Sequence, residues 1–399
     1  MNLRELFYRY LAQTSPEPLA IEIEKAEGIY LYAPDGKSYM DIISGISVSN
    51  VGHCHPEVRK AICEQSEKYM HVLVYGEMIQ TPQVRLAQRL ASLLPENLSS
   101  VYFVNSGTEA IEGAIKLARR FTGKQEIISC EHAYHGSTNG AMSLMGNDDF
   151  TQAFQPLLPQ CSRLRFGEVE DLEKITSSTA AFVVEVVQGE AGIRYADTAY
   201  WKQVRERCDQ TGTLLVFDEI QTGFGRTGTM FAFEQTGITP NIITFAKAMG
   251  GGMPIGAFVS SKEIMQTLTH NPTLGHITTF GGHPVCCAAA LASVDIIERE
   301  ELYKSAEEKG KLFESQLAKL PLVKEFRRKG LMMAMDFGDK KLNFKIIHRC
   351  IEGGIISDWF LFCDTAMRIS PPLIITKDEI KKACTIIKGI IKEIGLNLD

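Results

Sequence analysis

The stretch Asn241-Ile242-Ile243-Thr244-Phe245-Ala246-Lys247-Ala248-Met249-Gly250-Gly251-Gly252 places one lysine between an apolar run and three glycines. The run 242–245 is short and rich in β-branched and aromatic residues, which predicts a buried strand. The glycines let other groups approach the lysine closely. A desolvated lysine has a lowered pKa and can attack a carbonyl to form a Schiff base. An exposed lysine at a strand end is the alternative interpretation.

Short apolar runs alternate with longer amphipathic segments on both sides of this stretch. The expected strands are Val101–Val104, Glu126–Ser129, Ala180–Val184, Leu214–Phe217, Ile242–Phe245 and Ala257–Ser260. The expected helices are Pro82–Leu94, Thr108–Phe121, Tyr200–Thr211, Pro284–Glu300 and Lys304–Lys319. Such alternation is typical of an α/β fold with a mainly parallel sheet and helical crossovers.

Both chain ends are expected to form a second, smaller α+β domain. Strand-like runs at Leu331–Phe337 and Met367–Ile369 precede a closing helix at Lys377–Ile394. Near the other end, Tyr30–Tyr32 and Ser38–Ile42 are separated by a turn and predict a hairpin that could join this unit. We therefore expect a large domain over 51–305 and a small domain built from 1–50 and 306–399.

Composition predicts a soluble protein of the cytoplasm. The 399 residues carry a formal net charge of -6 from interspersed charges, without the basic stripe that nucleic acid or an anionic membrane would need. The amino-terminal segment has neither the basic start nor the apolar run of a signal peptide, and no later segment is apolar for long enough to span a bilayer. Ten scattered cysteines fit a reducing compartment, and no histidine spacing matches a zinc template, so we expect no metal.

A candidate phosphate site lies in Asn105-Ser106-Gly107-Thr108-Glu109-Ala110, directly after an expected strand. Free amides at the start of a helix favour an anion, and the two hydroxyls can also donate. A simple Ser or Thr N-cap with Glu109 in the first turn explains the same composition. The motif alone therefore names no ligand.

Two carboxylates, Asp218 and Glu219, end the apolar run Leu214–Phe217, and open α/β sheets build their sites at such strand ends. A nucleotide-hydrolysing enzyme would look similar here, but its phosphate loop G-x-x-x-x-G-K-[ST] is missing. The segment 223–228 matches G-x-G-x-x-G, yet no helix is expected to follow it. We interpret it as a flexible loop.

Taken together, these segments resemble the class III (ω-) aminotransferases, from about Gly28 to the Arg368–Pro372 region. The matching words are Gly52-His53-Cys54-His55-Pro56, Asn105–Ala110, Ala133-Tyr134-His135-Gly136, Glu185-Val186-Val187-Gln188-Gly189-Glu190, Phe217–Arg226, Phe245-Ala246-Lys247 and Thr278-Thr279-Phe280-Gly281-Gly282. The resemblance implies a fold-type-I pyridoxal-phosphate (PLP) enzyme. Its large domain would hold a mainly parallel, seven-stranded type of central sheet with helices on both faces.

The resemblance also implies a set of cofactor contacts. Lys247 would hold PLP as a Schiff base and shuttle the proton, Asp218 would pair with the pyridine nitrogen, and Tyr134 would stack on the ring. The phosphate would rest on Ser106, Gly107 and Thr108 and be completed by Thr279 of the other subunit, which implies a homodimer. The remaining expected contacts are His135, Glu185 and Gln221.

For the substrates, Arg368 corresponds to the arginine that grips a carboxylate, and Glu190 to the acid that masks it in ornithine and γ-aminobutyrate aminotransferases. This pair favours glutamate and 2-oxoglutarate as one substrate couple. Relatives acting on acetylornithine, ornithine or γ-aminobutyrate commonly have an arginine where this chain has Ser137, and ornithine enzymes a tyrosine where it has Ile46. Tyr75 is a further candidate for the substrate pocket, and the amine donor stays open.

We therefore expect a ping-pong transaminase acting on an amino donor and a 2-oxo acid. Other PLP chemistry on the same scaffold, as in an aminomutase, an epimerase or a decarboxylating transaminase, needs the same Lys247 and Asp218. A non-catalytic phosphate- or nucleotide-binding α/β protein is the remote alternative.

Overall fold

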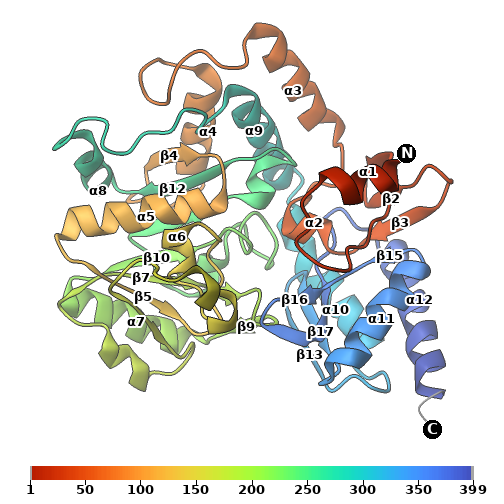
Figure 1. Cartoon of the computed structure of the whole chain (residues 1–399). Helices are drawn as coiled ribbons and strands as arrows, with labels where there is room; N and C mark the ends of the chain where they lie inside the picture. The colour runs from red at the N-terminus through yellow and green to blue at the C-terminus, as the bar shows by residue number, and fades with distance from the viewer. Residues whose placement is uncertain (1, 397–399) are drawn as a thin grey trace.

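A computed structural model describes residues 2–396. Residues 1 and 397–399, which the predicted small domain includes, lie outside the described residues. Figure 1 shows two parts, with the middle of the chain on one side and both chain ends together on the other. The helices are α1 Leu3–Tyr10, α2 Ser44–Ser47, α3 Pro56–Lys68, α4 Thr81–Ser92, α5 Gly107–Thr122, α6 Asn139–Met142, α7 Thr198–Thr211, α8 Lys262–Gln266, α9 Pro284–Arg299, α10 Ala306–Leu317, α11 Lys340–Glu352 and α12 Lys377–Leu396.

The larger part is built on a seven-stranded sheet of order β4-β12-β11-β10-β7-β5-β6. Its strands are β4 Ser100–Val104, β5 Glu126–Cys130, β6 Cys161–Leu164, β7 Thr179–Glu185, β10 Leu214–Asp218, β11 Ile242–Phe245 and β12 Gly256–Ser260. Neighbours are parallel except at β12, which runs antiparallel to both β11 and β4. The predicted α/β fold with a mainly parallel sheet is therefore confirmed.

The register places polar side chains together at one edge of this sheet. Asp218 at the end of β10 lies opposite Glu185 of β7 and Thr244 of β11. Because the carboxyl ends of parallel strands meet at one edge, side chains far apart in sequence converge there. Lys247 follows β11 directly, so it reaches the same edge.

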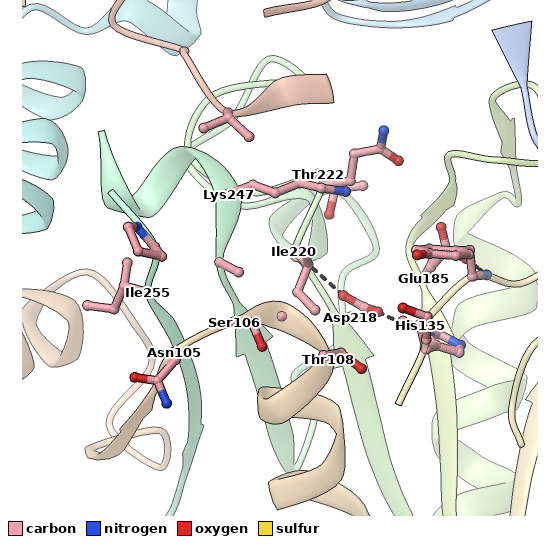
Figure 2. A pocket seen from close by; sticks show the side chains of 18 of the residues that line it. Asn105, Ser106, Thr108, His135, Glu185, Asp218, Ile220, Thr222, Lys247 and Ile255 are labelled. Carbon is pink, nitrogen blue, oxygen red and sulfur yellow. Dashed lines mark hydrogen bonds and ion pairs between the residues drawn. The ribbon is translucent and has the colours of Figure 1, made fainter. Parts of the chain in front are cut away.

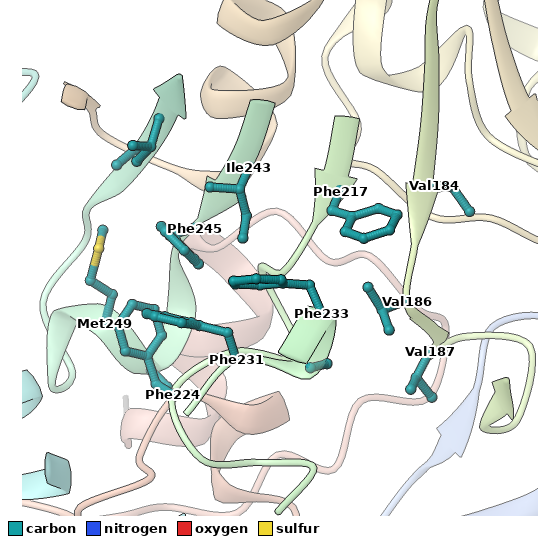
Figure 3. Close-up of a cluster of buried hydrophobic side chains, with 14 of the residues drawn as sticks. Val184, Val186, Val187, Phe217, Phe224, Phe231, Phe233, Ile243, Phe245 and Met249 are labelled. Carbon is teal, nitrogen blue, oxygen red and sulfur yellow. The ribbon is translucent and has the colours of Figure 1, made fainter. Parts of the chain in front are cut away.

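Aromatic and aliphatic side chains fill the space beside the sheet (Figure 3). Phe217 and Phe245 from the sheet pack with Phe224, Phe231 and Phe233 of the segment that joins β10 to β11, and all five are buried. Burying a large apolar side chain contributes about 1.5–3 kcal/mol. This segment contains the G-x-G-x-x-G match and is not the flexible loop that we predicted, because its phenylalanines belong to the core.

Most expected element bounds agree with the structure to within two residues. The expected strand Met367–Ile369 begins four residues too late, because β17 (Cys363–Ile369) starts at Cys363. The expected helix Lys304–Lys319 agrees to within two residues with α10, which follows a separate 3-10 turn at Leu302–Ser305. The strand β6 was not predicted, since Cys161-Ser162-Arg163-Leu164 has only one strongly apolar residue. It occupies the edge of the sheet, where a strand needs little apolar surface.

The smaller part combines both ends of the chain. Its strands are β1 Lys25–Glu27, β2 Tyr30–Tyr32, β3 Ser38–Asp41, β13 Glu325–Lys329, β14 Met332–Asp336, β15 Ile355–Ile356, β16 Trp359–Phe360 and β17 Cys363–Ile369, with the short pair β8 Val187–Gln188 and β9 Arg194–Tyr195 lying outside it. The hairpin of β2 and β3 pairs with β15, which joins the two ends in one sheet. A separate buried cluster draws on residues 29–42 and 306–394. On this basis we propose the division into 51–305 and 1–50 with 306–399.

Two further observations bear on the expected partners. No helix within residues 2–396 is both long enough and apolar enough to cross a membrane. In the same range, no three His, Cys, Asp or Glu side chains gather as a metal ion would require. All ten cysteines are unpaired thiols.

Candidate active site

A cavity of about 460 Å³ opens at the carboxyl edge of the sheet. Figure 2 shows side chains from both flanks of the sheet pointing into it. Its lining brings together most of the residues singled out from the sequence, namely Ser106, Gly107, Thr108, Tyr134, His135, Ser137, Glu185, Glu190, Asp218, Gln221 and Lys247. These residues span more than a hundred positions, so the fold rather than local sequence assembles the site.

Asp218 is a buried carboxylate held from three sides. His135 Nδ1 lies 2.7 Å from Oδ2 and the backbone N–H of Ile220 donates to Oδ1 at 3.0 Å (Figure 2). The Thr244 hydroxyl lies 3.4 Å from Oδ1. Burial lowers the pKa of His135, but its hydrogen bond to Asp218 and the charge of that carboxylate outweigh burial, so the pKa is raised. These three contacts fix the orientation of the Asp218 carboxylate.

Glu185 clamps the loop that carries Tyr134. Its Oε1 accepts the backbone N–H of Tyr134 and its Oε2 that of Gly189, both at 2.9 Å. Burial raises the pKa of Glu185 to about 7 even though these hydrogen bonds oppose the shift. Burial likewise raises the pKa of the Tyr134 phenol. The clamp sets where the Tyr134 ring stands at the cavity wall.

The start of α5 forms a cradle of backbone groups at the bottom of the cavity. Ser106 is the N-cap and accepts the N–H of Glu109 at 3.3 Å, while the amides of Gly107 and Thr108 belong to the first turn, whose N–H groups lack partners within a helix. The Thr108 hydroxyl pairs with that of Thr138 at 2.7 Å. A Cβ atom on Gly136 would collide with Thr108, so glycine at 136 allows the two loops to meet.

Lys247 stands at the end of β11 with φ of 43°, in the left-handed region that a lysine rarely adopts. Strain of this kind is concentrated at functional sites, where the surrounding structure enforces it. Burial lowers the pKa of Lys247, although the carboxylates of Glu190 and Asp218 oppose the shift. A larger share of the amine is therefore neutral and nucleophilic near neutral pH than for an exposed lysine.

Arg368 lies behind the cavity wall in a bidentate ion pair. Its Nη1 and Nη2 donate to the two oxygens of Glu190 at 2.9 and 2.8 Å, and its Nε donates to Asp358 at 2.9 Å. Both Arg368 and Glu190 are buried, and Glu190 lines the cavity. The pKa of Glu190 is lowered because Arg368 outweighs the effect of burial.

Four residues predicted for the site do not line the cavity of this chain: Arg368, described above, Tyr75, Thr279 and Ile46. Tyr75 packs its ring 4.5 Å from that of Tyr102 and donates its hydroxyl to the Val101 carbonyl at 3.2 Å. Its backbone N–H donates to Thr278, so Tyr75 and Thr279 lie on adjacent segments. Ile46 lies in α2 with φ of 64°, two residues before Val48, which does line the cavity.

Sequence reasoning missed several residues that hold this site. Asp358 binds Arg368 and sits in a region without any recognisable motif. Glu112 accepts the Thr138 hydroxyl at 2.6 Å and the N–H of Gly140 at 2.9 Å, which fastens the loop after Ser137 to α5. The one sequence signal for Glu112 is that it is a carboxylate within the helix that begins at the candidate phosphate site.

The arrangement fits PLP. The first turn of α5 offers amides to a phosphate, Asp218 offers an anion to a protonated ring nitrogen, and Lys247 offers an amine to a carbonyl. His135 also leaves its Nε2 buried without a hydrogen-bond partner in residues 2–396. An α/β sheet with an amine and a carboxylate at neighbouring strand ends, facing an anion cradle, defines a PLP-dependent enzyme of fold type I.

Comparisons with known proteins agree. The class-III aminotransferase family profile matches residues 10–391. The acetylornithine aminotransferases of Methanopyrus kandleri and Methanocaldococcus jannaschii are 39% and 41% identical, over 96% and 94% of this chain and 97% and 94% of theirs. The ornithine aminotransferase of Toxoplasma gondii, solved with PLP at partial occupancy, superposes with a TM-score of 0.91 at 29% identity, covering 99% of this chain and 95% of that one.

The chain belongs to the class III aminotransferases. It is therefore a PLP-dependent enzyme that transfers an amino group between an amino donor and a 2-oxo acid. A non-catalytic phosphate- or nucleotide-binding protein is excluded by this membership.

Proposed function

We propose that glutamate and 2-oxoglutarate form one substrate couple of this transaminase, with Arg368 binding a substrate carboxylate. The observation that carries the proposal is the bidentate pair of Arg368 with Glu190, which lies at the cavity wall. A carboxylate of the substrate can replace that of Glu190 in the same fork geometry. When Glu190 stays in place, Arg368 is neutralised and the cavity suits the amino end of a substrate without a neighbouring carboxylate.

Bound PLP supplies a carbonyl that couples to amines and a ring that withdraws electrons from the substrate carbon. The chain's own residues carry out the remaining tasks. Lys247 would hold that carbonyl through its amine, and once free it would move the proton at the substrate carbon. Asp218, held by His135, would keep the ring nitrogen protonated, and Tyr134 at the cavity wall would cover one face of the ring.

For the other substrate, we propose an amine whose distal end carries no carboxylate near Ser137. Among the described residues that line the cavity none is an arginine, and Lys247 is the one lysine. A donor carboxylate at this end would meet the uncharged Ser137, without a guanidinium to neutralise it. N-acetylornithine is the second candidate, because the relatives compared above that are 39% and 41% identical act on it by name.

The test is the visible absorption spectrum of the holoenzyme with single donors. Glutamate and one ω-amine should each bleach the cofactor band, and 2-oxoglutarate should restore it. Arg368→Lys should raise the KM for 2-oxoglutarate by about tenfold or more while sparing bleaching by the ω-amine. Unchanged KM for 2-oxoglutarate in this variant would contradict the proposal. Product analysis with 2-oxoglutarate present separates transamination from aminomutase, epimerase and decarboxylating chemistry.

We also propose that the enzyme is a homodimer in which Thr279 reaches the partner's cofactor phosphate. Two adjacent loops support this proposal, since the rings of His71 and Phe280 lie 5.1 Å apart. They expose apolar side chains at Met70, Val72, Leu73, Met78, Ile79, Leu274, Ile277 and Phe280. The side-chain amide of Gln80 is buried beside them without a partner in residues 2–396. Apolar patches of this kind mark protein–protein contacts.

A further inference from the structure

Arg226 is a fully buried cation that contacts only neutral acceptors. Its side chain is 0% exposed. Its Nη1 donates to the carbonyls of Leu331 at 3.1 Å and Pro371 at 2.6 Å. Its Nη2 donates to Ser44 Oγ at 3.0 Å and to Asn50 Oδ1. No carboxylate forms an ion pair with it within residues 2–396.

Burying a charge without an opposite charge is costly. Burial lowers the pKa of Arg226 to about 9, and the nearby Asp41 carboxylate only partly offsets this effect. A buried ion of this kind is a poor source of stability, so its geometry is the better explanation for its presence. The planar guanidinium can satisfy four acceptors at fixed angles, which no other side chain can do.

The four acceptors lie on segments that surround the carboxylate-binding arginine. Pro371 follows β17, three residues after Arg368. Ser44 Oγ donates in turn to the carbonyl of Ser370 at 2.7 Å. The Arg226 carbonyl accepts the N–H of Leu331 at 3.0 Å, so β14 is tied to the same point. The guanidinium thus joins the segment after β10 to both ends of the chain.

One of these segments is strained. Residues 44–47 have φ values of 47°, 60°, 64° and 61°, and only Gly45 tolerates this region without cost. Asp41 accepts the N–H groups of Ile43 and Ser44 at 2.9 and 2.7 Å. Such a turn persists only where the surroundings enforce it. The turn leads directly into Val48 at the cavity wall.

We propose that Arg226 is a positioning residue for carboxylate binding, which holds the β17 end that carries Arg368 and the turn 44–47 in one fixed arrangement. The proposal rests on the proposed role of Arg368. Arg226 itself touches neither substrate nor cofactor, and it acts by keeping the guanidinium of Arg368 and the wall at Val48 at the distance that a dicarboxylate needs.

The test is Arg226→Lys in the holoenzyme, with Arg205→Lys as the matched control. The Arg205 side chain is mostly buried, at 18% exposed, but it lies in α7 and bonds Asn241 and Asp209 rather than the segments around Arg368. Lysine keeps the charge of Arg226 but has three donors for four acceptors. The readouts are the Kd of glutarate by calorimetry, which needs no turnover, the KM and kcat for 2-oxoglutarate, and the midpoint of thermal unfolding.

In Arg226→Lys we expect the Kd of glutarate and the KM for 2-oxoglutarate to rise about tenfold or more, with the rate of the ω-amine half-reaction changed less than about twofold. Arg205→Lys should lower the unfolding midpoint without changing either constant. A loss of stability in Arg226→Lys with unchanged Kd for glutarate would overturn the proposal. If that variant does not fold, Ser44→Ala replaces it in the test, because it removes a single acceptor of Arg226. An unchanged Kd of glutarate in Ser44→Ala would also overturn the proposal.

The role of Arg368 is checked in parallel. If Arg368→Lys leaves the Kd of glutarate unchanged, the proposed function fails. If Arg368→Lys weakens glutarate and Arg226→Lys does not, only the positioning role of Arg226 fails.

Discussion

Glycine at position 189 leaves the space that Gln221 occupies at the cavity wall. A Cβ atom on Gly189 would collide with Gln221 Oε1, and Gly189 is itself held by its N–H bond to Glu185. We predict that Gly189→Ala displaces Gln221 and lowers kcat by about tenfold or more, because a small displacement of a group in the active site strongly lowers the reaction rate. Steady-state kinetics with the visible spectrum checks this. Gly389→Ala is the control, since a Cβ there meets no atom within 4 Å. Equal kcat in both variants would contradict the prediction.

We propose that Ser137 separates the two donor classes. Its side chain lines the cavity and carries no charge. We predict that Ser137→Arg lowers the KM for N-acetylornithine by about tenfold and raises that for a neutral ω-amine, because a guanidinium binds a carboxylate in bidentate fashion. The ratio of kcat/KM values for the two donors is the measurement, with Ser137→Lys as a control for charge alone. If the ratio does not move, Ser137 does not contact the donor.

The segment between β10 and β11 depends on one buried carboxylate. Glu219 is 0% exposed and accepts the N–H groups of Ala232 and Phe233 at 3.1 and 2.6 Å, as well as the Thr222 hydroxyl. Burial raises the pKa of Glu219 to about 7 despite these hydrogen bonds. Asp218 and Glu219 are adjacent in sequence, yet one faces the cavity and the other fastens the next segment.

This raised pKa predicts a pH dependence of stability. Between the unfolded pKa near 4.5 and the folded value of about 7, the folded state binds more protons, so this carboxyl contributes less stability as pH rises through that window. Glu219→Gln does not titrate and leaves an amide facing an N–H donor, which costs about 1–3 kcal/mol. We expect the stability advantage of the parent over Glu219→Gln to be larger at pH 5 than at pH 7. Thermal unfolding midpoints of both proteins at both pH values test this. A stability advantage of the parent that grows from pH 5 to pH 7 would contradict the prediction.

At the scale of elements, the apolar runs predicted the central strands well because both faces of a parallel sheet are buried. The run Ile242–Phe245 is β11 without correction. The edge strand β6 was not predicted, because a half-exposed edge strand lacks the continuous apolar run that identifies a buried strand. The turn 44–47 was not predicted either. The sequence Ser44-Gly45-Ile46-Ser47 has no local preference for a left-handed conformation, so tertiary contacts must impose that conformation.

Across the whole molecule, the cavity was predictable wherever a functional side chain ends a strand or begins a helix. Asp218, Lys247 and Ser106 all occupy such positions, and all line the cavity. Partners that lie far away in sequence without a motif, such as Asp358 for Arg368, were not predictable. The same holds for Arg226, whose acceptors come from positions 44 to 371. Long-range pairing of this kind depends on the assembled fold.

The largest structure that we propose is the dimer, and Ile79 offers the sharpest test of it. Its side chain is 93% exposed, although an isolated monomer gains nothing from an apolar group there. We predict that Ile79→Glu sediments as a monomer and binds PLP more weakly, because a buried charge disrupts the apolar contact and Thr279 no longer reaches the partner's cofactor phosphate. Sedimentation velocity and equilibrium dialysis of PLP measure the two effects. Leu396→Glu, at an exposed residue ending α12, should leave both unchanged. A monomeric parent enzyme with full PLP affinity would rule out a partner's contribution to the site, whereas joint loss of assembly and PLP affinity in Ile79→Glu would support it.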